Sequence, residues 1–346
     1  MSWQALLGPL TRHEPVPIDA VRWGMREVMS GAATSAQIAA FAVAMRMHGE
    51  TAEEVAALVD VMLEFSEPIT AQGVALDTCG TGGDGAHTVN ISTMAAVLLA
   101  AAGVPIVKHG NRAASSKCGS ADVLEALGVR IDINAATAQR VLDEVGITFC
   151  FAATFHPALR FAGPTRREIA VPTTFNLLGP LANPAQPKAQ IVGVADVTRA
   201  PLMLGALRLR GTSALVVRGH DGLDELSIYA PSSVWTTWSD EVVTLKPAAL
   251  GIPVHPSDGL RGGDADFNAD VARALLGGAT SGVLAPVADA VILNAAAGHV
   301  AVDVAHGQIP NALPEAIAAH MAHLRSLLES GAALGLLERW AAATQR

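Results

Sequence analysis

Hydrophobic residues in the first 68 positions recur at helical spacing only. Two capping-box sequences, Thr34 to Gln37 and Thr51 to Glu54, each precede such a stripe. The stripes contain Ile38, Phe41, Met45, Val55, Leu58, Val59, Met62 and Leu63. Short amphipathic helices cannot bury all of their apolar faces alone. We therefore expect this region to pack on another part of the chain or on a second subunit.

From about residue 74 the pattern changes to strand, loop and helix. Short apolar runs predict buried strands at 74–77, 104–108, 147–152, 189–196 and 214–219, and helical patterns lie at 90–103 and 120–128. This alternation predicts a largely parallel sheet covered by helices. The segment 225–245 alternates with many hydroxyl side chains and predicts an antiparallel addition. A C-terminal helix is indicated by the stripe of Ile317, Met321, Leu324 and Leu328.

These patterns predict an α/β protein with a small all-helical domain and a large α/β domain. The large domain has a mostly parallel central sheet flanked by helices. We expect residues 1–70 to form the small domain, and residues 71–169 and 189–346 to form the large one. The segment 172–187 interrupts the α/β pattern with a short helix bounded by prolines. We expect residues 170–188 to join the small domain.

Composition and charge narrow the range of functions. The 346 residues carry a net charge of −9, which disfavours general binding to nucleic acid or to an anionic membrane. Three widely spaced cysteines match no disulfide framework or metal motif, so we expect a cytoplasmic protein. The N-terminus lacks a signal-peptide pattern. Apolar runs such as 94–107 look too short to span a bilayer, so we expect no membrane partner.

The segment 77-DTCGTGGDGAHTVNIST-93 contains the most informative motif. Residues 80–85 match G-x-G-x-x-G, the dinucleotide-binding pattern. However, the helical pattern starts only after AHTVN, and the second strand ends in Lys108 and His109 rather than in an acidic residue. A Walker loop is excluded because no Gly-Lys-Ser/Thr follows. The match to the dinucleotide pattern is therefore accidental.

A different phosphate site fits this segment better. Successive glycines let backbone N–H groups converge on an anion, and the following helix offers an N-terminus with Asn90, Ser92 and Thr93. The next strand leads into 108-KHGNRAASSKCGS-120, which supplies three cations and a second helix start. Two such loops at consecutive strand ends suit a ligand with more than one phosphate. The alternative is two ordinary loops with a basic surface patch.

Two further groups of residues carry candidate chemistry. Asp224 and Glu225 follow a buried strand and can bind Mg²⁺, although such a pair by itself is more often a solvated turn. His156 precedes a proline, which favours an extended loop. Arg166 and Arg167 then offer guanidinium groups for a substrate carboxylate. Without further context, an exposed helix with salt bridges is the better explanation of these two arginines.

Taken together, eight segments of the chain resemble the anthranilate phosphoribosyltransferase family. They are GTGGD (80–84), NIST (90–93), KHGNRAASS (108–116), GSADVLEALGV (119–129), HPA (156–158), RRE (166–168), FNLLGPLANPA (175–185) and HDGLDE (220–225). The resemblance implies a helical domain and an α/β domain, usually assembled as a homodimer through the helical domain. It implies transfer of the phosphoribosyl group of phosphoribosyl diphosphate (PRPP) to the amine of anthranilate, a step of tryptophan biosynthesis. Two Mg²⁺ ions per site are implied as cofactors.

The resemblance also implies roles for individual residues, without any covalent nucleophile. The PRPP site would contain Gly80, Gly83, Asp84, Thr88, Asn90, Ile91, Ser92, Thr93, Lys108, His109, Gly110, Asn111, Arg112, Ala113, Ala114, Ser115, Ser116 and Ser120. Anthranilate would meet Gly80, His109, Asn111, His156 and Arg166. The metal ligands would be Ser92, Asp224 and Glu225. The chain departs from the family pattern at Leu159, Ala170 and Pro172, which flank the expected anthranilate channel.

Two rival functions belong to proteins of the same fold. A nucleoside phosphorylase would bind free phosphate and a nucleobase, and it would need neither the Asp224–Glu225 pair nor the KHGNR segment. A non-catalytic nucleic-acid-binding relative would show a basic surface and eroded diphosphate motifs. Here the net charge is negative and the motifs are intact.

Overall fold

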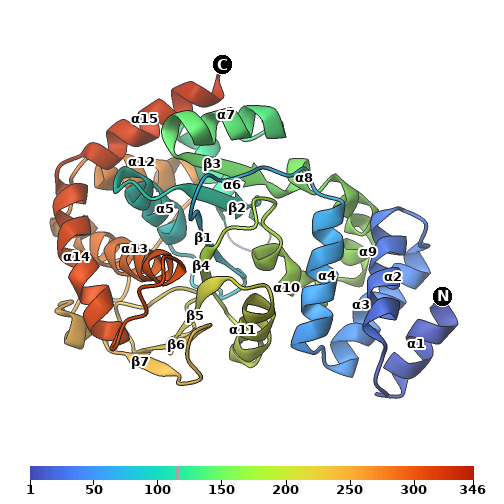
Figure 1. The fold of residues 1–346 in the computed structure, drawn as a ribbon. Helices are drawn as coiled ribbons and strands as arrows, with labels where there is room; N and C mark the ends of the chain where they lie inside the picture. Colours follow the sequence, from blue (N-terminus) through green and yellow to red (C-terminus); the bar gives the residue numbers. More distant parts are fainter. Residues whose placement is uncertain (114–116) are drawn as a thin grey trace.

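A computed structural model describes residues 1–113 and 117–346. The first four helices form a bundle at one end of the molecule, seen at the right of Figure 1. They are α1 (Trp3–Thr11), α2 (Ile18–Met29), α3 (Ser35–His48) and α4 (Ala52–Glu64). Both predicted capping boxes are confirmed. The Gln37 N–H donates to Thr34 Oγ1 over 3.3 Å, and the Glu54 N–H donates to Thr51 Oγ1 over 3.1 Å.

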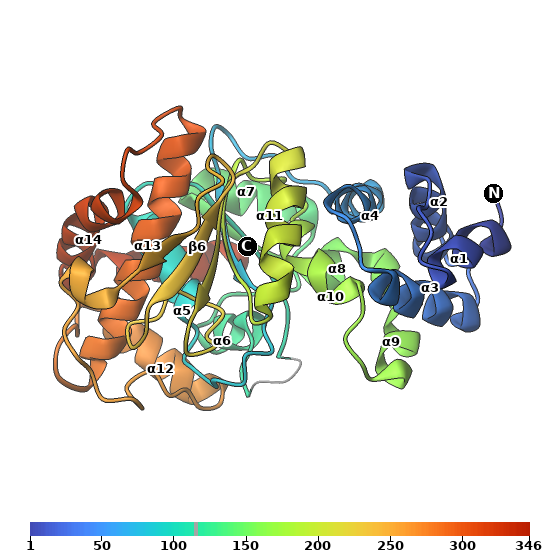
Figure 2. The same ribbon diagram turned by 90° about the horizontal axis from the view of Figure 1, so that it is seen from below.

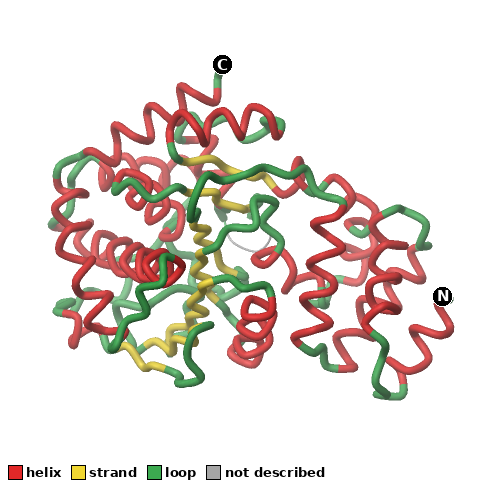
Figure 3. Tube along the Cα trace, in the orientation of Figure 1, coloured by secondary structure: helices red, strands yellow, loops and turns green. Residues whose placement is uncertain are grey.

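A seven-stranded sheet forms the centre of the rest of the chain (Figure 3). Its strand order is β3-β2-β1-β4-β5-β6-β7. The strands are β1 (Leu76–Gly80), β2 (Ile106–Gly110), β3 (Ile147–Phe151), β4 (Ala189–Gly193), β5 (Ser213–Gly219), β6 (Ser232–Thr236) and β7 (Val243–Leu245). The first five in this order are parallel, and β6 and β7 are antiparallel. The mostly parallel sheet and its antiparallel addition are thus confirmed.

Helices cover both faces of this sheet, as the view in Figure 2 shows. Helices α5 and α13 pack with α14 against one face around a large aliphatic core, and α11 lies between the other face and α4. The longer helices here are α5 (Ile91–Ala101), α7 (Ala135–Val145), α11 (Ala200–Leu209), α12 (Ala265–Leu276), α13 (Ala285–Ala305), α14 (Leu313–Glu329) and α15 (Ala332–Thr344). A shorter helix, α6 (Ser120–Ala126), follows β2.

Helix α13 corrects one expectation from the sequence. The stretch Gly282–Ala305 is long and apolar enough to cross a membrane, so the expectation that every apolar run is too short was wrong. Its most apolar window is 78% buried inside the protein. The helix is apolar over most of its surface and packs against α5, α14 and the sheet, so it serves as a core helix here.

Three short helices connect the sheet to the helical bundle. They are α8 (Ala152–Phe155), α9 (Gly163–Ile169) and α10 (Phe175–Leu178). Helix α9 packs on α3 and α10 packs on α4, and the side chains of Phe175 and Leu178 share an apolar cluster with the bundle. These contacts support the proposal that residues 170–188 belong with the small domain, and they suggest that α9 joins it too.

A buried ion pair ties the bundle to the α/β layers. The side chain of Glu50, between α3 and α4, is 0% exposed and pairs over 2.8 Å with Arg199 just before α11. The Thr174 hydroxyl, next to α10, donates to the same carboxylate. Three chain segments that are distant in sequence therefore meet at one charge.

Replacing Arg199 with Met should destabilise the protein strongly, because it leaves the Glu50 carboxylate buried without its cation. Loss of one partner of a buried pair costs about 3–5 kcal/mol. The matched control is Arg12→Met, since the Arg12–Glu14 pair lies on the surface and such pairs contribute about 0–1 kcal/mol. Urea unfolding would measure both variants. Equal shifts in the two midpoints would contradict the interdomain role of Glu50.

Candidate active site

The carboxyl ends of β1, β2, β4 and β5 meet at one edge of the sheet. The glycine-rich loop follows β1, and its Gly82, Gly83 and Gly85 all have positive φ between 67° and 82°. Helix α5 starts only at Ile91, beyond the glycine run, and β2 ends at Lys108–Gly110. Both observations confirm that the loop is not a dinucleotide fingerprint.

Three carboxylates gather above these strand ends. Asp224 accepts a hydrogen bond of 2.7 Å from the backbone N–H of Gly82. The backbone N–H of Asp224 in turn donates over 3.4 Å to Asp84, which lies in the glycine loop. Glu225 is adjacent and interacts with the backbone of Ser92 at the start of α5. The structure therefore brings together Asp84, Ser92, Asp224 and Glu225 from three separate motifs.

This cluster depends on two close backbone approaches. A Cβ atom on Gly193, at the end of β4, would lie 1.5 Å from the carbonyl oxygen of Asp224. A Cβ on Gly80, at the end of β1, would lie 2.4 Å from the Asp224 carboxylate. Any other residue at these positions would displace the acidic loop from the glycine loop. Gly193 could not be identified from sequence, because no motif contains it.

The cluster is electrostatically strained in the absence of a cation. Burial, together with the charge of Asp84, raises the pKa of Asp224 to about 7. Burial and the charge of Asp224 raise the pKa of Glu225 to about 8. Carboxylate oxygens beside a hydroxyl are the donor set that Mg²⁺ prefers. A bound divalent cation would neutralise the mutual repulsion, so these residues fit Mg²⁺ chemically.

Lys108 supplies a positive charge beneath the cluster. Its side chain is buried, and its ammonium donates to the Thr78 carbonyl and to Ser92 Oγ, the latter over 3.3 Å. Burial lowers the pKa of Lys108, and the carboxylate of Asp77 partly offsets this.

Asp77 is itself fully buried, and its carboxylate accepts hydrogen bonds from the His109 N–H over 3.1 Å and from the Asn183 amide over 2.9 Å. Asp77 and Asn183 thus fix the end of β2 and were not singled out from sequence.

Asn294 is another residue that sequence reasoning missed. It is buried in α13, where its amide pairs with both backbone groups of Leu226 over 2.9 and 3.1 Å. Leu226 directly follows the acidic pair, so Asn294 holds that loop against the core helix. Its only sequence signal is an amide in a mostly apolar helix, which a satisfied core residue would also produce.

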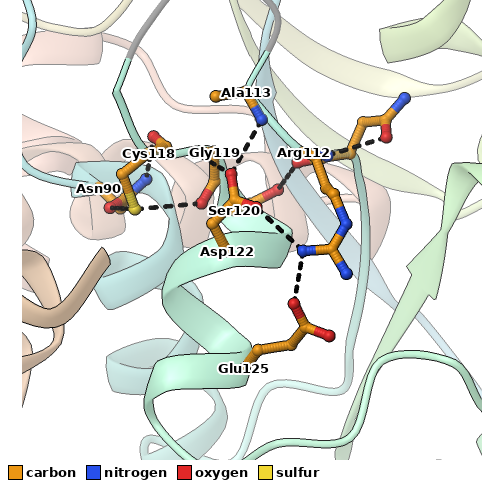
Figure 4. A network of polar contacts seen from close by, with 9 residues as sticks. Asn90, Arg112, Ala113, Cys118, Gly119, Ser120, Asp122 and Glu125 are labelled. Carbon is orange, nitrogen blue, oxygen red and sulfur yellow. Dashed lines mark hydrogen bonds and ion pairs between the residues drawn. The ribbon is translucent and has the colours of Figure 1, made fainter. Parts of the chain in front are cut away.

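The second phosphate loop is held by Asp122 of α6 (Figure 4). Asp122 accepts from the N–H groups of Ala113 and Gly119 over 3.0 and 2.8 Å. Arg112 pairs with Asp122 over 3.0 Å and also with Glu125, and both bonds raise the pKa of Arg112. The guanidinium of Arg112 is therefore neutralised within the protein, and a ligand phosphate would have to compete for it.

Asn90 occupies a similar internal position. Its amide donates to the Cys118 carbonyl over 3.2 Å and accepts from Asn268 of α12 over 2.9 Å (Figure 4 shows the Cys118 contact). Asn90 makes no side-chain cap to α5. Its role in the structure is to join the two phosphate loops to each other and to α12.

The remaining predicted phosphate residues are placed as follows. The backbone of Thr88 forms an isolated antiparallel β-bridge with Arg261, and the side chain of Ile91 is buried. The buried hydroxyl of Thr93 has no hydrogen-bond partner in the described part of the chain. Gly110 contacts Ser120 so closely that a Cβ would lie 2.2 Å from its Oγ. Asn111 is exposed and accepts from the Arg112 N–H. Ala114, Ser115 and Ser116 lie outside the described residues.

Two of the predicted site histidines pack against each other, each held by a carbonyl of the 179–182 segment. The His109 and His156 rings lie 5.1 Å apart. Carbonyl oxygens fix both: Gly179 O accepts from His109 Nδ1 at 3.0 Å, and Ala182 O accepts from His156 Nε2 at 2.7 Å. Burial lowers the pKa of His109 to about 3 and also lowers that of His156. Both rings are therefore neutral at pH 7, and His109 Nε2 has no partner among the described residues.

Arg166 lies on α9, beyond these histidines. Its guanidinium stacks 5.4 Å from the Phe175 ring centroid, and burial lowers its pKa. Within residues 1–113 and 117–346 no carboxylate pairs with it. The α9 helix ends at Ile169, and Ala170 directly after it adopts φ 55°, a conformation that glycine tolerates better. Arg166 is thus a partly desolvated cation suited to a planar anion, unlike the exposed Arg167.

A cavity of about 560 Å³ opens beside the second half of the glycine loop. Residues 86–88 line it on one side, and Asp221 and Leu223 of the acidic loop line it on another. The 257–262 segment and Tyr229 close it from the antiparallel side. This space is large enough for a small phosphorylated molecule.

The fold and this edge of the sheet define a two-domain glycosyl transferase. Residues 4–66 match the model of the glycosyl transferase family helical bundle domain, and residues 72–334 match the model of the glycosyl transferase family a/b domain. The anthranilate phosphoribosyltransferase of a Nocardioides species is 50% identical over 347 aligned positions, covering 100% of this chain and 99% of that relative. The enzyme of that name from Acidothermus cellulolyticus is 51% identical, covering 99% and 96%.

Solved structures agree with these relatives. The anthranilate phosphoribosyltransferase of Thermus thermophilus superimposes with a TM-score of 0.89 at 38% identity, covering 98% of this chain and 99% of that one. The Saccharomyces cerevisiae enzyme in complex with PRPP and Mg gives a TM-score of 0.82 at 27% identity, covering 95% and 92%. The chain belongs to the anthranilate phosphoribosyltransferase family.

Replacing Asp224 with Asn should raise the melting temperature at pH 8 in metal-free buffer. The folded pKa of Asp224 lies above its unfolded value, so its contribution to stability is present at low pH and is lost as the pH rises through about 7. The gain should exceed about 2 °C, the shift that ~1 kcal/mol gives a domain of 150–250 residues. It should shrink towards pH 4. A variant that melts below the parent at pH 8 would contradict the inference that ionised Asp224 destabilises the folded protein.

Proposed function

We propose that this chain transfers the phosphoribosyl group of PRPP to the amine of anthranilate, giving N-(5-phosphoribosyl)anthranilate and diphosphate. The observation that carries the proposal is the acidic cluster at the strand ends, set between two phosphate loops and a buried lysine. The full-length similarity to relatives of that name supports the same reaction. A nucleoside phosphorylase would have no use for the Asp224–Glu225 pair.

The diphosphate of PRPP would lie against the glycine loop with Mg²⁺. The structure of the yeast relative in complex with PRPP and Mg supports the use of both ligands. Asp224, Glu225 and Ser92 would hold two Mg²⁺ ions, with Asp84 beside them. Magnesium neutralises charge on a departing diphosphate oxygen. Lys108 fixes the Ser92 hydroxyl from below, and Asn294 fixes the loop behind the acidic pair. The phosphoribosyl part would occupy the N-terminus of α5 and the 108–120 loop.

Anthranilate would enter past His109 and His156 and meet Arg166, with Gly80 and Asn111 at the inner end. Arg166 can bind the carboxylate in bidentate fashion, since no carboxylate of the described chain competes for it. His109 can accept a hydrogen bond from the amine at Nε2, because its Nδ1 is already committed to Gly179. It would position the amine; a pKa of about 3 makes it a weak base.

The reaction needs alignment and charge neutralisation more than acid–base chemistry. The bond between the anomeric carbon and the diphosphate oxygen breaks, and the bond to the amine nitrogen forms. The amine then loses a proton to water. An aromatic amine is nucleophilic without deprotonation, so positioning and electrostatics supply most of the rate.

We further propose a cytoplasmic homodimer. The helical bundle exposes apolar side chains, including Val43 and Met47 of α3, which a second copy can cover. The measurement that tests this assembly is the mass of the purified protein in solution. A monomer at micromolar concentration would contradict it.

The proposed reaction predicts loss of anthranilate fluorescence when purified protein, PRPP and Mg²⁺ are all present. Omitting PRPP or the metal should abolish the loss. Parallel detection of diphosphate gives an independent readout with equal stoichiometry. Folded protein that produces neither signal would contradict the proposed function.

Arg166→Ala should raise KM for anthranilate at least tenfold and leave KM for PRPP within about threefold. Loss of a charge-assisted bidentate contact costs about 1.5–3 kcal/mol, which corresponds to a factor of roughly 10–150. Arg167→Ala is the matched control, because its side chain is exposed on the same helix. Equal losses for both substrates would show that Arg166 does not clamp the carboxylate.

A further inference from the structure

A second group of metal-ligand side chains lies on the face of α13 and α14, the helices at the left of Figure 1. His299 and Asp303 are four residues apart on α13, and His320 is on α14. The spacing i, i+4 places the first two side chains on one face of the helix. None of the three belongs to the acidic cluster or to either phosphate loop.

Their ligand atoms converge. One from each residue lies within 4.8 Å of the other two. His320 Nε2 is 2.7 Å from Asp303 Oδ2, and His299 Nδ1 is 3.5 Å from Asp303 Oδ1. The two imidazole rings stack with centroids 4.0 Å apart and an angle of 24°. Two rings and one carboxylate therefore face a common point from two helices.

A simple hydrogen-bonded cluster does not account for all three side chains. The His320–Asp303 contact is a good hydrogen bond, but His299 Nδ1 is buried without a hydrogen-bond partner in the described part of the chain. An unpaired buried polar atom is costly and calls for an explanation. A cation between the three groups would satisfy this nitrogen.

The spacing suits a small transition-metal ion. With ligand bonds of about 2.0–2.1 Å, neighbouring ligand atoms of a tetrahedral zinc site are roughly 3.3–3.5 Å apart. The His299–Asp303 distance already has this value, and the His320–Asp303 distance needs to open by less than about 1 Å to reach it. The hydrogen-bonded proton of His320 would move to its other ring nitrogen or leave. The side chains are 22–28% exposed, so the group lies near the surface of the protein.

We propose that His299, Asp303 and His320 form a site for a divalent transition-metal ion of the Zn²⁺ type, separate from the Mg²⁺ site. Imidazole ligands select such ions, whereas Mg²⁺ prefers oxygen donors. The ion fastens α14 to α13. Asn294, which holds the acidic loop, lies five residues before His299 on the same helix, about 7.5 Å along its axis. The proposed metal site therefore lies on the same helix that holds the acidic loop of the candidate active site.

The test is a titration of the untagged full-length chain with Co²⁺ in metal-free buffer containing excess Mg²⁺. Absorption reports Co²⁺ binding, and thermal melting with Zn²⁺ reports stabilisation. We expect about one Co²⁺ per chain and a higher melting temperature with Zn²⁺. Because even loss of a residue that only supports a ligand costs ~10–100-fold in metal affinity, His299→Gln and His320→Gln should each weaken binding at least tenfold.

Two variants separate the proposed site from other binding. His323→Gln removes an exposed histidine one turn further along α14 and should retain Co²⁺ binding and the Zn²⁺ stabilisation. Asp224→Asn alters the acidic cluster and should retain them as well. Melting without metal shows whether each variant is folded. Binding that survives His320→Gln but is lost in Asp224→Asn, or no binding to the folded parent, would overturn the proposal.

Discussion

The candidate site depends on how closely the acidic loop approaches the ends of β1 and β4. No side chain fits at Gly193 or Gly80 without displacing Asp224. This approach places Asp224 on the backbone of the glycine loop and Glu225 next to the start of α5. The parallel sheet makes it possible, because β1, β4 and β5 all end at one edge. The rest of the site is arranged around this contact.

The arrangement costs stability without a ligand. Burial and neighbouring charges raise the pKa of Asp224 to about 7 and that of Glu225 to about 8. Lys108, which lies next to this pair, has its own pKa lowered by burial. Protein sites that hold such strain are commonly functional, since a ligand can relieve it. The buried groups around the cluster limit its relaxation. Asp77 and Asn183 fix β2, and Asn294 fixes the acidic loop.

Much of the fold follows from sequence. The capping boxes start α3 and α4 where expected, and the apolar runs mark the buried strands. The motif spacing correctly excluded a dinucleotide loop, because α5 begins beyond the glycines. The strand order and the packing of α9 on α3 did not follow, since they depend on contacts between distant segments. The long apolar stretch of α13 was not recognised, because two aspartates interrupt its apolar pattern. Both aspartates have partners inside the protein: Asp289 contacts His255 and Arg325, and Asp303 contacts His320.

Some residues of the candidate site could also be predicted from the sequence, and others could not. Loop motifs identified the carboxylates, the lysine and the phosphate loops, because each of these groups lies within one short, contiguous segment. Gly193 and Asn294 lie in none of the motifs, and the role of Asn183 within the 175–185 motif was not apparent, because each is an ordinary residue until its partner is known. Asn90 and Arg112 belong to the motifs, yet their side chains serve mainly to join the two loops and α6 (Figure 4).

The most direct test of the strained cluster is calorimetry of Mg²⁺–PRPP binding at pH 7.5 in two buffers with different ionisation enthalpies. The difference gives the number of protons released. Because burial and mutual repulsion raise the pKa of both carboxyl groups, part of the protein carries a proton on this pair at pH 7.5, and binding of the cation must expel it. We expect net release of protons on binding, with a smaller release in Asp224→Asn. Binding without proton release in either protein would contradict it.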